Sequence, residues 1–129
     1  MTTSFSFDKK LPLVIVPVSI KIKETVFDFN FAIDTGASIS LIDFELLQTL
    51  GLTKEKSIKT IQTITASKQE NAYEFLIPNL KALGIIRRNF RIISRKLPVG
   101  LGIDGLLGVN FFKNKQLIID FRKGELMLS

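Results

Sequence analysis

Apolar side chains recur at every second position in two neighbouring stretches of the chain, residues 13–22 and 27–33. A period of two places alternate side chains on one face of an extended strand, and a helix cannot reproduce it. A short polar stretch, residues 23–25, separates the two patterns and suits a turn. The sequence therefore predicts a β-hairpin whose second strand delivers Asp34 at its C-terminal end.

The rest of the chain reads as further short elements. A short helix is expected after Asp43 as N-cap, with Gly51 as the left-handed residue that ends it. An amphipathic helical turn is expected near Asn110, and Gly124 suits the turn of a closing hairpin. The expected strands are 58–65, 72–77, 90–94, 116–121 and 125–128, with 79–84 open between strand and loop. This pattern predicts a mainly β barrel or sandwich with one or two short helices, as a single domain over residues 1–129.

The absence of two residue types restricts the chemistry available to the chain. There is no cysteine, which excludes disulfides, thiolate nucleophiles and thiolate-bound metals. There is no histidine, which removes the usual general base and most zinc and iron sites. An enzyme built from this chain must work with carboxylates, lysine, tyrosine, hydroxyls or an oxygen-bound metal.

The formal net charge of +6 raises the question of an acidic partner. The basic residues gather only in residues 85–96, where they alternate with apolar ones, as on the solvated face of a strand. We therefore favour a wet strand face over nucleic-acid binding. No signal-peptide pattern opens the sequence, and no apolar run approaches the roughly 18 residues of a membrane span. A cytoplasmic protein without membrane contact is the default expectation.

The segment AIDTGAS, residues 32–38, places an acidic residue and a glycine where the second strand ends. A single aspartate on a turn is an ordinary turn residue. Two carboxyl groups in contact behave differently from a single aspartate. They share one proton, so that one acts as a base while the other acts as an acid. Such a pair can activate water and protonate a carbonyl without histidine or metal. Gly36 would let backbone N–H groups point at the Asp34 carboxylate, and Thr35 would lock the loop to a neighbour.

AIDTGAS resembles the active-site motif of the aspartic proteases, in particular the small retropepsin-like branch. GLLGVNFF, residues 105–112, is similar to the hydrophobic–hydrophobic–glycine segment of that family. LIIDFRKGELML, residues 117–128, is similar to the final hairpin of the family. The resemblance covers most of residues 11–128.

The resemblance implies a small closed β-barrel in which the later segment passes behind the Asp34 loop. Leu106, Leu107, Gly108 and Asn110 would form that support. Because the chain carries one such motif, the resemblance implies a homodimer in which Asp34 and its symmetry mate share one site. It implies hydrolysis of a polypeptide substrate with no cofactor and no metal.

The remaining roles also come from the resemblance. Thr35 would bond across the two-fold axis, and Gly36 would line the substrate backbone. Ala37, as in the retroviral type, implies a mildly acidic working pH. Ser38 and the tip of a flap formed by residues 58–77, namely Ala66, Ser67 and Lys68, would bind substrate.

Two alternatives stay open at this point. Asp104 lies in IDGLLG, a faint echo of AIDTGAS, and is a weak candidate for a second carboxylate within one chain. The whole chain could also be a catalytically silent module that kept the fold for protein binding or dimerisation. The flap tip without glycine and the basic stretch at 85–96 favour that second alternative.

Overall fold

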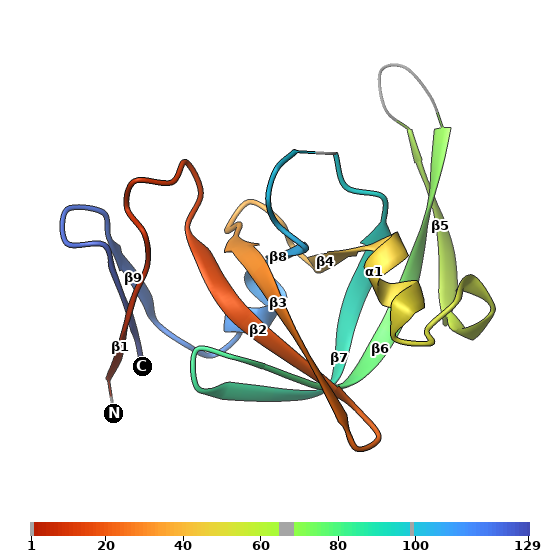
Figure 1. The fold of residues 1–129 in the computed structure, drawn as a ribbon, viewed down its shortest axis with the longest axis horizontal. Coiled ribbons are helices and arrows are strands. Elements are labelled where there is room, and N and C mark those ends of the chain that lie inside the picture. Colours follow the sequence, from red (N-terminus) through yellow and green to blue (C-terminus); the bar gives the residue numbers. More distant parts are fainter. Residues whose placement is uncertain (1, 65–68, 99) are drawn as a thin grey trace.

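The computed structural model describes residues 2–64, 69–98 and 100–129 as ten β-strands, one α-helix and two 3₁₀ helices. The strands are β1 (Thr3–Ser6), β2 (Ile15–Ile22), β3 (Thr25–Ile33), β4 (Ser40–Asp43), β5 (Lys59–Ile64), β6 (Gln69–Ala82), β7 (Ile85–Arg95), β8 (Gly105–Leu107), β9 (Leu117–Asp120) and β10 (Glu125–Leu128). The helices are α1 (Phe44–Thr49), η1 (Lys54–Lys56) and η2 (Val109–Phe112). The strands form a seven-stranded and a three-stranded sheet (Figure 1).

Six strands of the larger sheet close into a barrel. Their order is β2-β3-β8-β4-β7-β6, and residues 18–21 of β2 pair with residues 79–82 of β6 to complete the ring. A closed ring protects the backbone donors and acceptors of its strands from pairing elsewhere. β5 pairs with β6 outside the ring, and the two project from the barrel as a long hairpin (Figure 1). The predicted all-β barrel is confirmed, and the sandwich alternative is wrong.

The period-two pattern of the first hairpin corresponds to burial. β2 and β3 form the predicted hairpin and pair from Ile15 opposite Ala32 to Ile22 opposite Thr25, so that Thr25, expected in the turn, belongs to β3. Val16, Val18 and Ile20 of β2 are almost fully buried, and they meet a core that includes the buried rings of Phe31, Phe75 and Phe111. Successive side chains of a strand point to opposite faces, so the apolar residues at every second position all lie on one face of the hairpin, which packs in the barrel core.

Strands β6 and β7 are longer than the sequence predicts. The expected strands end at Ile77 and begin at Phe90, whereas β6 runs to Ala82 and β7 starts at Ile85. The pairing is interrupted where Pro78 faces Asn89, because the register passes from Ile77–Phe90 to Asn79–Arg88. Pro78 has no N–H to donate, and Asn89 has a left-handed φ of 49°. These two residues break the alternation while the strands continue past them.

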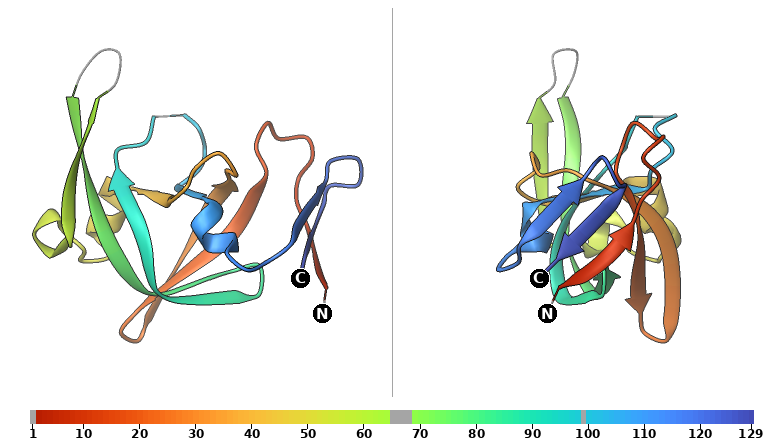
Figure 2. Two further views of the ribbon diagram at one scale, coloured as in Figure 1. Left: turned by 180° about the vertical axis from the view of Figure 1, so that it is seen from behind. Right: turned by 90° about the vertical axis from the view of Figure 1, so that its left-hand side faces the viewer.

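Both ends of the chain lie in the three-stranded sheet. β10 is its central strand, with β1 on one side and β9 on the other, all antiparallel (Figure 2). Leu126 and Leu128 of β10 are buried in the same core cluster as the barrel residues. The predicted closing hairpin is confirmed, and Gly124 has the expected positive φ of 69°.

The helix α1 begins and ends as predicted, but Asp43 does not cap it with its side chain. The Asp43 carboxylate instead accepts the Leu97 N–H at 2.9 Å, so it ties α1 to the segment after β7. Gly51 adopts the expected left-handed φ of 83°. Among the described residues, no helix is long and apolar enough to cross a membrane.

Gly105 lies where strands β3, β4 and β8 leave no space for a side chain. A Cβ atom there would be 2.6 Å from the Phe31 ring, and closer still to the backbone oxygen of Leu41. We expect Gly105→Ala to lower the free energy of unfolding by about 2 kcal/mol or more, because a packed core resists added volume. The measurement is urea unfolding followed by circular dichroism.

Gly51→Ala is the matched control, because no atom would lie within 4 Å of its Cβ and only the positive φ opposes the change. It should cost about 1 kcal/mol. Equal losses in the two variants would contradict the role of Gly105.

Candidate active site

Asp34 lies directly after β3, where the chain leaves the barrel wall. Its backbone N–H donates to the Leu107 carbonyl at 2.9 Å, which extends the parallel pairing of β3 with β8 by one residue. The Asp34 carboxylate accepts the Gly36 N–H at 3.0 Å, and its carbonyl accepts the Ala37 N–H at 3.1 Å. The carboxylate is half-buried and held by its own turn. The turn therefore fixes the direction of the Asp34 side chain before any ligand is bound.

The chain after β8 passes behind this turn. The Val109 N–H donates to the Ala37 carbonyl at 2.7 Å, and the Gly108 N–H donates to the Ser40 hydroxyl at 2.9 Å. A Cβ atom on Gly108 would lie 2.6 Å from the Ala37 carbonyl oxygen. Only glycine lets the two backbones approach this closely. The structure thus brings together Asp34, Leu107 and Gly108, which the sequence places far apart.

Asn110 completes the support from the same side. Its side-chain oxygen accepts both the Ser40 N–H and the Ser40 hydroxyl at 2.8 Å. Its side-chain nitrogen donates to the Arg91 carbonyl on β7 at 2.8 Å. Ser40 is fully buried, so these bonds satisfy polar groups that water does not reach. One side chain therefore joins the end of the Asp34 loop to η2 and to β7.

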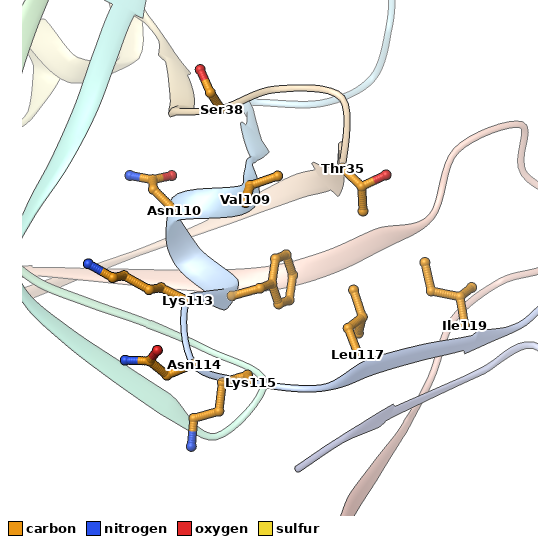
Figure 3. Close-up of a pocket in the computed structure, with 10 residues that line it drawn as sticks. Thr35, Ser38, Val109, Asn110, Lys113, Asn114, Lys115, Leu117 and Ile119 are labelled. Atoms are coloured by element: carbon orange, nitrogen blue, oxygen red, sulfur yellow. The ribbon is translucent and has the colours of Figure 1, made fainter.

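Thr35 and Ser38 border an open groove beside the loop, with the Thr35 side chain pointing toward Leu117 and Ile119 and the Ser38 hydroxyl pointing away from the groove (Figure 3). Both residues are exposed and line a cavity of about 530 Å³ (Figure 3). Apolar side chains of η2 and β9 line the opposite side, namely Val109, Phe112, Leu117 and Ile119. Polar residues of the same segment also border it: Asn110, Lys113, Asn114 and Lys115. This groove is not predicted by the sequence. No periodic signal links η2 and β9 to the loop, and only their order after Gly108 hints at proximity.

Three further aspartates, the candidate Asp104 among them, have structural partners. The Asp104 carboxylate accepts the Asn30 N–H at 2.8 Å and so holds the segment before β8 against β3. Asp28 accepts a hydrogen bond from Ser19 on the outside of the first hairpin. Asp120 accepts two backbone N–H groups of the closing turn. Within the described ranges, no three acidic side chains gather as ligands for a cation.

Two arginines of the basic stretch are also engaged in the structure. The Arg87 guanidinium donates to the carbonyls of Phe111 and Lys113, and it lies over the Phe111 ring at 5.7 Å. Arg91 forms an ion pair with the buried Glu74 of β6. The expected flap-tip residues Ala66, Ser67 and Lys68 lie outside the described residues. The strands that flank them in the sequence are β5 and β6.

A closed barrel with a DTG turn crossed from behind by a glycine segment defines an acid-protease type of architecture. The sequence pattern of a family described as "Aspartyl protease" matches residues 16–111. That match includes both the turn and the crossing segment, so the chain belongs to the aspartyl protease family.

Solved structures show the same fold. A retropepsin-like aspartic protease from Rickettsia conorii superposes with a TM-score of 0.74 at 19% identity, covering 99% of this chain and 89% of that one. The retroviral protease-like domain of Ddi1 from Leishmania major gives a TM-score of 0.51 at 16% identity, covering 85% and 82%. No curated protein matches the chain in sequence. The retropepsin-like fold expected from the sequence is therefore confirmed.

The contacts of Asn110 lead to a prediction about the stability of the loop. Asn110→Ala leaves the buried Ser40 N–H without its acceptor, and an unsatisfied buried donor costs about 1–3 kcal/mol. We expect a loss of free energy of unfolding in that range, together with faster hydrogen exchange at the Ser40 and Gly108 amides. Thermal unfolding measures the loss of stability, and NMR measures the hydrogen exchange of the two amides.

Asn71→Ala is the control, because Asn71 is an exposed residue on β6. It should change the free energy of unfolding by no more than about 0.5 kcal/mol. If Asn110→Ala left the exchange of both amides unchanged, the supporting role of Asn110 would be wrong.

Proposed function

We propose that this protein is an aspartic endopeptidase in which Asp34 of one chain and Asp34 of a second chain form one catalytic site. The observation that carries the proposal is the half-buried Asp34 carboxylate, held by the Gly36 N–H in a turn supported by β8. Membership of the aspartyl protease family supports the same reaction class. The chain supplies one such turn, so a pair of carboxylates requires a second copy.

The chemistry follows from two carboxyl groups that share one proton. Repulsion between two charged carboxylates keeps one of them protonated. The charged Asp34 removes a proton from a water molecule, whose oxygen bonds to the peptide carbonyl carbon. The protonated Asp34 donates its proton to the carbonyl oxygen, giving a neutral tetrahedral intermediate. Transfer of a proton to the amide nitrogen then breaks the C–N bond and releases an amine and a carboxylic acid.

The loop residues have supporting roles in this proposal. Thr35 is exposed beside the groove, where its hydroxyl can bond to the second copy across the axis. Gly36 and Ser38 are exposed and would border the substrate backbone. The substrate is an extended polypeptide, because an extended backbone can pair with strand edges such as those of the β5–β6 hairpin. No cofactor, metal or nucleic acid has a part in the reaction.

Asp34→Asn should abolish cleavage, because an amide cannot act as the base or share the proton. The measurement is mass spectrometry of a diverse peptide library incubated between mildly acidic and neutral pH. Asp28→Asn is the matched control, since Asp28 lies on the same strand and its carboxylate contacts Ser19 on the outside. The Asp28→Asn variant should cleave peptides as the unmodified protein does. Loss of cleavage in that variant would contradict the assignment of Asp34 as the catalytic carboxylate.

A mixing experiment tests whether two chains share the site. Adding an excess of Asp34→Asn protein to a fixed amount of unmodified protein should lower its cleavage, because mixed dimers contain only one aspartate. Adding Asp28→Asn protein should not lower it. A stable dimer that cleaves no peptide at any pH would instead favour the alternative function, a catalytically silent module that keeps the protease fold for protein binding or dimerisation.

A further inference from the structure

Three basic side chains gather on the outer face of the barrel. The strand registers place Lys21 of β2 and Arg88 of β7 on either side of Asn79 of β6, and Lys81 follows two residues further along β6. The three basic residues are exposed. Side chains directly opposite each other on paired strands have Cβ atoms roughly 5 Å apart, and diagonal neighbours also interact. The three positive charges therefore form one cluster on the sheet.

Folding leaves this cluster without a partner. Within the described ranges of the chain, none of the three cations forms an ion pair, whereas Arg91 of β7 pairs with Glu74. The carboxylate of Asp28 borders the same face, where it accepts the Ser19 hydroxyl at 2.9 Å. Like charges on neighbouring strands repel each other. Three positive charges beside one negative charge thus give a face that an added carboxylate would stabilise.

An open apolar cavity of about 360 Å³ adjoins the cluster at Lys81. Three of the residues that line it, Val16, Ala82 and Leu83, are buried. The remaining lining residues are Phe5, Ser6, Pro17, Ser19, Lys81 and Gly84. The described residues around this cavity include none of those that line the groove beside the Asp34 loop. Its volume lies in the range of cavities that bind ligands.

The turn between β6 and β7 forms one wall of the cavity and extends toward the strands at the chain termini (Figure 2). Leu83 and Gly84 are its central residues, and their φ angles are 51° and 74°. Two-residue hairpin turns favour positive φ, but a leucine rarely adopts it. The Leu83 side chain is only 7% exposed and belongs to the core cluster. Its burial offsets the unfavourable φ, so the wall is formed before any ligand binds.

We propose that the cavity and the three cations form a docking site for an extended segment of another protein, in which an apolar side chain stands next to acidic residues. The apolar side chain enters the cavity. The carboxylates pair with Lys81, Lys21 and Arg88 along the outer face of the sheet. The site goes beyond the proposed function, because binding there needs neither Asp34 nor a second copy of the chain.

The chemistry of this face favours an acidic protein segment over other anionic partners. A single side chain can enter a cavity lined by buried residues, whereas a flat lipid surface cannot, and three basic residues attract anionic lipid only weakly. Bases of a nucleic acid stack on exposed aromatic rings, but Phe5 of the cavity is packed against the core. A second copy of this chain lacks the required segment, because no two acidic residues are adjacent in the sequence.

The test measures fluorescence anisotropy of a labelled peptide in which a phenylalanine precedes a run of glutamates. The protein is the full-length Asp34→Asn variant, so the probe is not cleaved and the result does not depend on the proposed function. One control peptide has alanine in place of phenylalanine, and another has lysines in place of the glutamates. A dissociation constant above about 1 mM for the first peptide, or equal binding of all three, overturns the docking site.

The first peptide should bind with an affinity that falls as the salt concentration rises, because exposed charges are screened. The alanine peptide should bind roughly tenfold more weakly or worse, because it does not fill the apolar cavity. The lysine peptide should not bind, because its charges repel the cluster. Binding of the first peptide that does not respond to salt contradicts the role of the three cations.

Two pairs of variants locate the site on the protein. Lys81→Glu should weaken binding roughly tenfold or more, because a like charge then faces the peptide. Lys123→Glu makes the same change of net charge at another exposed position and should alter binding by less than about twofold. Ser6→Phe places a bulky ring at the cavity and should weaken binding, whereas Ser4→Phe, on the same strand outside the cavity, should not. An equal effect within either pair rules out this location.

NMR shifts of the backbone amides during titration give a measurement on the same protein without further variants. The amides of Ser19, Lys81 and Gly84 should shift with the first peptide, while those of Thr35 and Val109 should not. Shifts confined to Thr35 and Val109 would place the peptide in the groove beside the Asp34 loop and would overturn the docking site. Binding to anionic lipid vesicles or to a single-stranded oligonucleotide, without binding of the peptide, would also overturn it.

Discussion

The structure depends on one crossing, where residues 105–110 pass behind the turn that carries Asp34. Four backbone N–H groups near this point have partners on the other segment, and Gly105 and Gly108 leave no space for side chains. The crossing places β8 between β3 and β4, so it also closes the barrel. The same hydrogen bonds that complete the fold therefore set the position of the Asp34 carboxylate.

The parts of the fold that local pattern determines could be predicted from the sequence. The alternation in residues 13–33 predicts β2 and β3, and Gly51 and Gly124 are recognised because each needs a positive φ. The crossing was predicted only by resemblance to a family, since nothing local to residues 105–108 shows which loop they meet. Within the site, the same resemblance predicts the turn that carries Asp34 and the supporting position of Asn110 behind it.

The parts that sequence reasoning missed come from tertiary contacts. Pro78 and Asn89 interrupt the pattern of β6 and β7 without ending the strands, because each lies opposite the other at a gap in the ladder. Asp43 has the residue type of a helix cap, but the Leu97 N–H competes for its carboxylate. The groove combines η2 and β9 with the Asp34 loop, and neither has a local signal for that contact.

The long separation between Asp34 and its supports has a consequence for the order of events during synthesis. Ser40 lies 70 residues before Asn110, the side chain that anchors it. A chain made from its N-terminus therefore presents the DTG motif long before the ribosome has released the segment that fixes its geometry. Until then the motif is present without a site.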